Sequence, residues 1–476
     1  MKTLVAFILF LYVCKSSQLQ ENSTKRVMGA YFANWAQYHT KPYTYTPEKL
    51  APIIGKVDQL MYSFLYFDDN TYNVRLIEPK DPEFIKTITG YKSSNPNLKV
   101  IASIGGWNFP SALFSKMMSS SESRSAFIKS LKDTLEKYQF DGVDIDWEYP
   151  CSSPRTDYVK YTCADIKDSH DAGGKCPDDT NNLLMFVKEL RQSLGSDAFI
   201  SFASPGSKDK WEKWDLKTMS SYVDYWHVMT YDYTVSDIKN SSVTAPNAPL
   251  YTPTDTNGVV QWSIDYTITG YLAAGVPANK IMLGIPLYGH TWYIPNIKGD
   301  EWQSYGLNAS IQGDCCGSFK STYGALYGKG SQLCGTYMYS EIVAAGPLYY
   351  FDTKTKTAIA YMAKDSQDGW TKAGTWFTYN DKNSIDAIAK YVGEKNLGGA
   401  FIFDTSEDSL SYETGEFTYT LMSALATGLK GGGGNEGQKN FCAPSPSSQC
   451  NVCQKCCKNY LTIQRDCDAC VVINCP

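Results

Sequence analysis

The sequence predicts an α/β fold, a (β/α)8 TIM barrel, from two observations. Eight short apolar runs recur along the 476 residues, and helix-like stretches separate most of them. Polar and aromatic residues follow the ends of these runs, where this fold gathers its functional side chains. The runs lie, in chain order, at residues 27–34, 59–65, 100–105, 142–148, 199–203, 225–230, 281–288 and 399–403.

The intervening segments follow the same plan. The stretches 123–138, 182–194 and 383–395 are helix-like and long enough to cross from one strand to the next. The interval between Trp292 and about Thr375 is too long for one loop, so we expect a small inserted domain between the last two strands.

The N-terminus, MKTLVAFILFLYVCKSSQ, has a lysine, a short apolar core and small residues, which predicts a signal peptide over residues 1–16. We therefore expect a secreted, extracellular protein that no membrane retains, because no later segment is long and apolar enough to span a bilayer. The net charge of −5 and the absence of a basic run argue against a nucleic-acid partner.

The composition changes near the C-terminus. Four glycines follow Lys430 and predict a flexible linker over 430–440. Eight of the fifteen cysteines lie in the segment 441–476, which predicts a small disulfide-rich module in a secreted chain. Zinc binding by its C-x-x-C pairs is the less favoured alternative. The six other mature cysteines form two sets of three, linked by one bridge or each with a free thiol.

The segment 140–150, FDGVDIDWEYP, holds an unusual concentration of acids. Asp144, Asp146 and Glu148 alternate with apolar residues, the period of a strand, so all three carboxyls share one face. Asp141 has the other parity and is expected at the strand's entry. Repulsion and burial raise carboxyl pKa values, so at least one proton should remain near neutral pH, which suits a general acid.

Two alternative roles for these acids are less favoured. A solvated strand face does not fit the apolar opposite side and the following Tyr149-Pro150, which indicate a buried strand. Ligation of Ca²⁺ or Mg²⁺ is compatible with clustered carboxylates. We favour acid chemistry and expect no metal and no other cofactor.

With these acids in place, the chain resembles the family 18 glycoside hydrolases, the chitinases, over about residues 26–429. The family signature D-x-x-D-x-D-x-E is complete as Asp141, Asp144, Asp146 and Glu148. Further matching stretches are YFANWAQY at 31–38, SIGGWNF at 103–109, MTYDY at 229–233, LGIPLYG at 283–289, YSEI at 339–342 and GGAFIFD at 398–404. The resemblance also implies that residues 293–375 form the family's α+β insertion domain, which walls one side of a groove.

The resemblance implies a reaction in which the substrate's 2-acetamido oxygen attacks the anomeric carbon, with net retention. Glu148 is then the general acid, Asp146 orients the acetamido N–H, and Asp144 shares a proton and charge with Asp146. Tyr231 donates to the acetamido oxygen, and Asp232 contacts the sugar. The implied substrates are chitin and chito-oligosaccharides, cleaved by a monomer.

Other cleft residues follow from the same stretches. The expected substrate-binding residues are Tyr31, Trp35, Phe64, Trp107, Met229, Asp232, Tyr288 and Phe403, whereas Trp226 is expected in the core. Two residues depart from the family pattern. Phe403 stands where most relatives have tryptophan, and His290 where many have arginine, so the cleft should have a smaller floor and should be either less positively charged or charged in a way that depends on pH.

Two other functions compete with a chitinase. A chitin-binding lectin on the same barrel is disfavoured because such relatives typically lose the last acid of the signature, and Glu148 is present. An endo-glycosidase acting on N-glycans shares the acids, but the inserted domain and the tryptophans favour a groove for a long polymer. The C-terminal module is compatible with a chitin-binding anchor or with an assembly role.

Overall fold

The computed structural model describes residues 25–150, 177–235, 243–253, 262–309, 335–411 and 413–431. All fifteen cysteines, the predicted signal peptide and the predicted disulfide-rich module lie outside these ranges. The chain divides into two units between Lys430 and Gly431, at the start of the predicted linker. Among the described residues, no helix combines the length and apolarity needed to cross a membrane.

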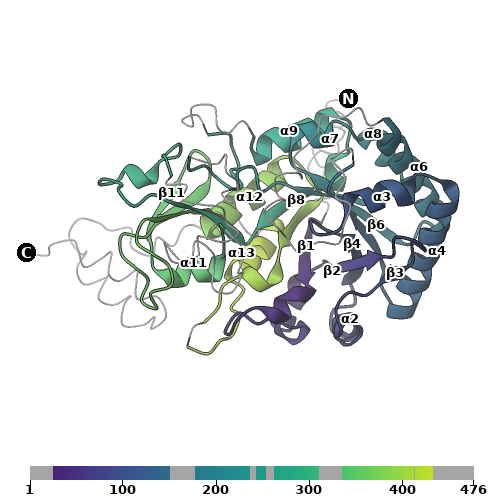
Figure 1. Cartoon of the computed structure of the whole chain (residues 1–476), viewed down its shortest axis with the longest axis horizontal. Helices are drawn as coiled ribbons and strands as arrows, with labels where there is room; N and C mark the ends of the chain where they lie inside the picture. Colours follow the sequence, from purple (N-terminus) through teal and green to yellow (C-terminus); the bar gives the residue numbers. More distant parts are fainter. Residues whose placement is uncertain are drawn as a thin grey trace, which may run out of the picture. The chain divides into compact units, whose positions relative to one another are not determined.

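Eight parallel strands form a closed barrel, as predicted (Figure 1). They follow the order β1-β14-β8-β7-β6-β5-β4-β2, and β2 pairs with β1 to close the sheet. A short strand, β3 (Val74–Arg75), adds to β2 in antiparallel orientation. The strands are β1 (Val27–Ala33), β2 (Gln59–Phe67), β4 (Lys99–Gly105), β5 (Gly142–Asp146), β6 (Phe199–Pro205), β7 (Tyr225–Met229), β8 (Ile281–Pro286) and β14 (Gly399–Phe403).

Alternation along each strand separates two cores. In β1, Phe32 packs into the layer between barrel and helices, whereas Tyr31 points into the barrel with Met61 and Phe401. Trp226 of β7 is fully buried and donates to Ser220, so the prediction that it is a core residue is confirmed.

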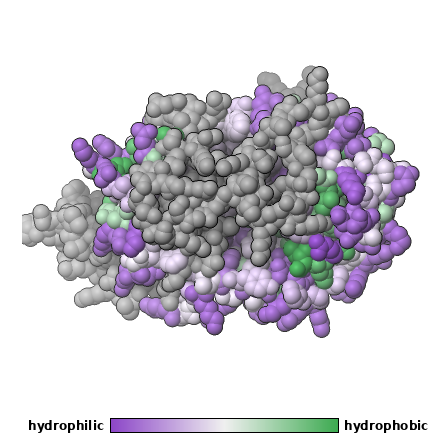
Figure 2. Space-filling view, in the orientation of Figure 1, coloured by the Kyte–Doolittle hydropathy of each residue, from purple (hydrophilic) through white to green (hydrophobic). Residues whose placement is uncertain are grey.

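Helices surround the barrel, and side chains define where several of them begin. Ser120, Ser263 and Asp381 each accept a backbone N–H from the first turn of the following helix. On the face seen in Figure 2 the described surface is mostly hydrophilic. The helices are α2 (Asp81–Gly90), α3 (Ser111–Met118), α4 (Ser121–Tyr138), α6 (Pro177–Leu194), α7 (Lys208–Trp211), α8 (Leu216–Met219), α9 (Ile264–Ala273), α12 (Lys382–Glu394) and α13 (Thr420–Leu429).

A second, antiparallel sheet lies between β8 and β14 in the chain, with strand order β10-β9-β13-β12-β11. Its elements are β9 (Tyr288–Tyr293), β10 (Thr336–Met338), α11 (Tyr339–Ala345), β11 (Leu348–Asp352), β12 (Thr357–Tyr361) and β13 (Thr375–Tyr379). The sheet therefore begins at Tyr288. The apolar run 281–288 is two strands, because β8 ends at Pro286 and the chain then enters β9.

Candidate active site

Asp144 lies inside the barrel and is fully buried. In the parallel register, Ser103 of β4 and Ser201 of β6 are its direct neighbours. Their hydroxyls donate to the Asp144 carboxylate at 2.8 Å and 2.7 Å, and the Tyr31 hydroxyl donates at 2.9 Å. The carboxylate therefore has three hydroxyl donors on three different strands.

A histidine completes the surroundings of Asp144. His227 of β7 is fully buried, with Nδ1 3.5 Å from Asp144 Oδ1 and Nε2 3.3 Å from Gln59 Oε1. Both ring nitrogens therefore lie near oxygen atoms of other buried side chains. Burial pushes the pKa of Asp144 upward, but the hydrogen bond and charge of His227 and the serine hydroxyls outweigh burial. The pKa of Asp144 is lowered, and this carboxyl is ionised.

Asp146 is in the opposite situation, two residues further along β5. It is buried, and its Oδ1 has no hydrogen-bond partner among the described residues. Burial, and then the nearby charges of Glu148 and Asp144, raise the pKa of Asp146 well above its usual value. The pKa of Asp146 is therefore shifted in the opposite direction from that of Asp144, although both carboxyls lie on one face of β5.

Glu148 follows the end of β5 and is half-buried, so it is more accessible than either aspartate. The intervening Trp147 is buried on the opposite side of the strand, between the barrel and the helices. It stacks on Phe114 of α3 and donates to Ser111 Oγ at 2.8 Å. The predicted alternation of acids and apolar residues is thus present. Asp141 lies at the strand entry, as predicted, where it accepts the Val100 N–H at 2.7 Å.

Two glycines allow the end of β4 to pass close to the acids. Gly105 and Gly106 have φ angles of +115° and +90°, which side chains rarely adopt. A Cβ on Gly105 would lie 2.2 Å from the Asp146 carbonyl oxygen, and one on Gly106 would lie 2.6 Å from the Phe64 ring. The Gly106 N–H donates to the Asp146 carbonyl at 2.9 Å. This contact holds the end of β5 beside the end of β4.

The end of β7 supplies the next part of the site. Met229 lies in the barrel interior, and Tyr231 packs against that cluster. Asp232 has a φ of +55°, a left-handed conformation that is uncommon without glycine. Its carboxylate accepts from Tyr288 at 2.8 Å and lies 2.7 Å from His290 Nε2, and Asn247 Oδ1 accepts its backbone N–H. These contacts fix Asp232 at the junction of the barrel and β9.

Aromatic rings surround Phe403 at the end of β14. Its ring centroid is 5.6 Å from that of Tyr31, 6.4 Å from Trp35 and 6.2 Å from Tyr231. Trp35 stacks on Phe64 at 5.6 Å with an interplanar angle of 11°. The structure thus brings four of the predicted cleft aromatics together with the predicted catalytic Tyr231, and Tyr288 contacts that tyrosine with ring centroids 6.2 Å apart. Trp107, directly after the Gly105-Gly106 pair, is half-buried.

Substituting Phe403 tests the expectation, taken from the sequence resemblance, that this cluster lies under a bound sugar. Phe403→Ala removes the ring, and we expect kcat/KM on chitohexaose to fall on the order of tenfold because a sugar face loses its aromatic contact. Phe403→Trp is expected to lower the free energy of unfolding by about 1–3 kcal/mol, since three rings already crowd the site. The control is Phe351→Ala, which alters a half-buried ring on the edge strand β11. Unchanged kinetics in Phe403→Ala would place the sugar elsewhere.

A group of buried acids follows Phe403. Asp404, Glu407 and Asp408 are all buried. Asp404 accepts from the backbone and the hydroxyl of Ser406, but burial outweighs these bonds and raises its pKa to about 6. The pKa of Glu407 is also raised, first by burial and then by Asp404. The short turn after the eighth barrel strand is therefore most stable when these carboxyls are protonated.

This gives a pH-dependent prediction. Because Asp404 binds its proton more tightly in the folded state, its contribution to stability is complete below pH ~4 and is lost as pH rises through about 6. The loss amounts to about 3 kcal/mol. Asp404→Asn keeps the acceptor oxygen without the charge, so its stability should not fall as pH rises. The unfolding free energy of the variant minus that of wild type should therefore be about 3 kcal/mol larger at pH 7 than at pH 4. Urea unfolding of both proteins at the two pH values measures the difference, and an equal difference at both would contradict the prediction.

Four polar residues of the site were not singled out from the sequence as individual residues. Ser103, Ser201 and His227 surround Asp144, and Asn247 holds Asp232. The three strand residues had a signal, because each is a polar residue inside an otherwise apolar run. Asn247 lies in a loop and had none. Within the described ranges, no three His, Cys, Asp or Glu side chains come together as a possible metal site.

Comparison with known proteins gives a consistent family. The model of the glycosyl hydrolases of family 18 matches residues 27–408. A probable endochitinase of Caenorhabditis elegans is 28% identical over 443 residues, and the match covers 88% of this chain but only 62% of that protein. An immunomodulatory active chitinase of Trichuris suis superposes with a TM-score of 0.67 at 25% identity, over 84% of this chain and 99% of that one.

A further structural neighbour bears on the choice between enzyme and lectin. Human YKL-39, described as a pseudo-chitinase with retained chitooligosaccharide binding, has a TM-score of 0.69 at 22% identity, over 85% of this chain and 99% of that one. At this identity the likeness shows the shared fold alone. The likeness therefore does not distinguish an enzyme from a lectin.

Proposed function

The chain belongs to glycosyl hydrolase family 18, and on that premise we propose that it is a secreted chitinase hydrolysing polymers of β-1,4-linked N-acetylglucosamine. The observation that carries the proposal is the stripe of three acids along and just beyond β5, each in a different environment. Asp144 accepts from three hydroxyls, Asp146 is buried with a raised pKa, and Glu148 stands at the more accessible end. A general acid beside a carboxyl with a raised pKa suits glycoside hydrolysis.

The proposed reaction uses the substrate's own acetamido group. Glu148 gives its proton to the glycosidic oxygen as the bond to the anomeric carbon breaks, and the acetamido carbonyl oxygen bonds to that carbon from the opposite face. Asp146 accepts from the acetamido N–H, and Tyr231 donates to the carbonyl oxygen. Water then attacks the anomeric carbon, the bond from that carbon to the acetamido oxygen breaks, and the water gives a proton to Glu148, which restores the enzyme and leaves a product of retained configuration.

Asp144 and the groups that donate to it stabilise the charge that develops in this reaction. An ionised Asp144 stabilises positive charge that develops on the sugar, and its hydroxyl donors hold it in one position. Phe403 and Trp35 offer apolar surface to the sugar ring, with the buried Tyr31 packed behind Phe403, and Asp232 presents a side chain that is 43% exposed. The substrate therefore meets an apolar floor and a polar wall.

Incubation with chitohexaose, followed over time, tests the proposal. We expect shorter N-acetylglucosamine oligomers whose first-formed anomer is β. A protein that binds the hexamer without releasing products would be a lectin like the pseudo-chitinase neighbour. Cleavage of N-glycans in preference to the hexamer would favour the endo-glycosidase alternative.

Activity is expected without added metal. Asp144 is committed to hydroxyl donors, and burial raises the pKa of Asp146, which opposes the charged form that a metal ion would require. Hydrolysis of chitohexaose should be the same before and after dialysis against EDTA. Inactivation by EDTA that Ca²⁺ or Mg²⁺ restores would contradict this expectation and return the acids to a metal-binding role.

A further inference from the structure

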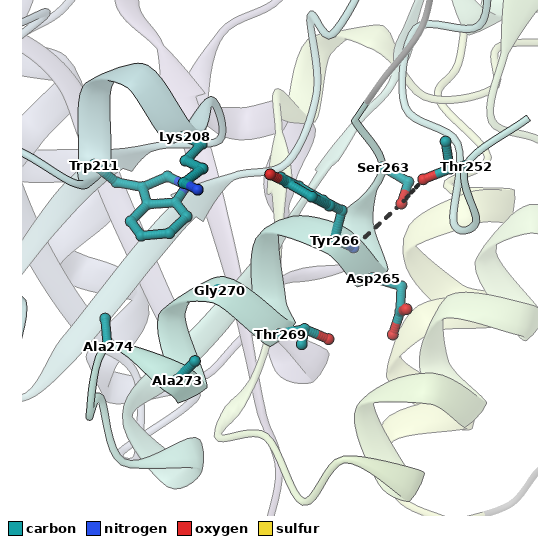
Figure 3. Close-up of a pocket in the computed structure, with 10 residues that line it drawn as sticks. All are labelled: Lys208, Trp211, Thr252, Ser263, Asp265, Tyr266, Thr269, Gly270, Ala273 and Ala274. Carbon is teal, nitrogen blue, oxygen red and sulfur yellow. Dashed lines mark hydrogen bonds between the residues drawn. The ribbon is translucent and has the colours of Figure 1, made fainter.

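A pocket of about 560 Å³ lies between α7 and α9 on the outer side of the barrel (Figure 3). Small-molecule sites are commonly of this size, roughly 300–1,000 Å³. None of the proposed catalytic or cleft residues lines it. Its wall contains Lys208, Trp211, Asp265, Tyr266, Thr269 and Gly270. Figure 3 shows Lys208 and Trp211 on one side and Tyr266 on the other.

Helix α9 has one face toward the barrel and another toward this pocket. Thr267 and Tyr271 tie the barrel face to β6, because their hydroxyls donate to the carbonyls of Gly206 and Pro205 at 2.7 Å and 2.8 Å. The pocket face carries Tyr266, whose side chain is 40% exposed, and then small residues through Ala274. The small residues form a shallow surface, called the shelf below, and the exposed ring of Tyr266 stands beside it.

The shelf depends on a glycine in the middle of the helix. Glycine there costs about 1 kcal/mol relative to alanine, so a compensating contact is expected. A Cβ on Gly270 would lie 2.5 Å from Cζ2 of Trp211, and the indole occupies that space. The Trp211 indole N–H is buried and has no acceptor among the described residues. The back of the pocket is therefore an indole with an unsatisfied donor.

The charges of the pocket favour a neutral ligand. Lys208 supplies one cation and Asp265 one carboxylate, and the latter already accepts from Tyr391 at 2.8 Å and pairs with Lys395 at 3.1 Å. An anionic ligand would meet Asp265, and a cationic one would meet Lys208. Hydroxyl groups of Thr252, Ser263 and Thr269 add donors and acceptors around the aromatic surfaces. This combination suits a neutral sugar with both hydroxyl and apolar faces.

We propose that the α7–α9 pocket is a second binding site for N-acetylglucosamine oligomers, distinct from the catalytic cleft. The sugar face stacks on Tyr266, the acetamido methyl lies on the small residues Ala273 and Ala274, and Lys208 donates to sugar oxygens. The choice of this sugar rests on the proposed function. A second contact with an insoluble polymer raises the local concentration of chain ends and loops at the cleft.

Calorimetric titration with chitohexaose tests the site in a Glu148→Gln chain, which should bind without cleaving. Tyr266→Ala removes the stacking ring. Ala273→Leu fills the pocket from an exposed helix position without altering either aromatic residue. The matched control is Tyr349→Ala, because that tyrosine is 50% exposed on β11, the edge strand of the second sheet.

Both pocket variants should bind one hexamer fewer per chain than the Glu148→Gln parent, or bind it on the order of tenfold more weakly, and the control should match the parent. With Glu148 restored, both should hydrolyse chitohexaose at the wild-type rate but insoluble chitin severalfold more slowly. Identical titrations for parent and pocket variants would overturn the second site. Hydrolysis of chitohexaose by the wild-type chain tests the proposed function separately.

Discussion

Glu148→Gln is expected to remove nearly all hydrolysis of chitohexaose, with kcat falling by about 10²–10⁴. The amide has the shape of the carboxyl but no proton to give to the leaving oxygen. Because Glu148 is half-buried beyond the end of β5, the substitution should leave the fold intact. Initial rates of product formation and an unchanged circular dichroism spectrum measure the two parts of the prediction.

The matched control for this substitution is Glu394→Gln. Glu394 ends α12, its side chain is 54% exposed, and it pairs only loosely with Lys390 at 3.5 Å. It should retain wild-type rates. A Glu148→Gln protein with more than about a tenth of wild-type activity would show that another group protonates the leaving oxygen, because that remnant exceeds what general-acid loss permits.

Asp144→Ala is expected to lower the free energy of unfolding by about 3–5 kcal/mol. The carboxylate is fully buried, and its removal leaves Ser103, Ser201 and Tyr31 without their acceptor and His227 without its anion. Losing a buried acceptor costs more than losing an exposed one, since the groups that donated to it stay desolvated. Urea unfolding at pH 7 measures the change.

Two comparisons separate this effect from a general loss of charge. Asp386→Ala removes an exposed carboxylate paired with Lys382 on α12 and should cost less than about 1 kcal/mol. The lowered pKa of Asp144 means that its contribution is complete above pH ~4 and fades as pH falls through the folded-state value. The difference in unfolding free energy between wild type and Asp144→Asn should therefore become smaller as pH falls below about 4. A gap that widens would contradict the assignment of charge.

The barrel could be predicted from the sequence because each strand is a short apolar run with a clear end. The stripe of acids could be predicted because period two places Asp144, Asp146 and Glu148 on one face whatever the neighbouring strands do. Which carboxyl is charged could not be predicted in this way. That depends on Ser103, Ser201 and His227, which lie 41, 57 and 83 residues away from Asp144 and meet it only through strand register.

The boundary between barrel and second sheet was also beyond the sequence. Residues 281–288 read as one strand, because Leu287 and Tyr288 continue the apolar run. In the structure the run is divided after Pro286, where β8 ends. The Leu287 N–H donates to the carbonyl of Phe403 on β14, and Tyr288 begins β9 in the antiparallel sheet. A change of pairing partner leaves no mark on hydrophobicity.

Ser103, Asp144 and Ser201 are paired in register on three adjacent strands, and this pairing affects how the barrel assembles. If β4 or β6 slid by one residue, the serine would face the helices, and a slide of two residues would carry its hydroxyl about 6.6 Å away. Either error would leave an ion without its donors in a dry interior. The hydroxyl groups that donate to Asp144 thus also favour the native strand register, because a barrel with a shifted strand would be less stable even without substrate.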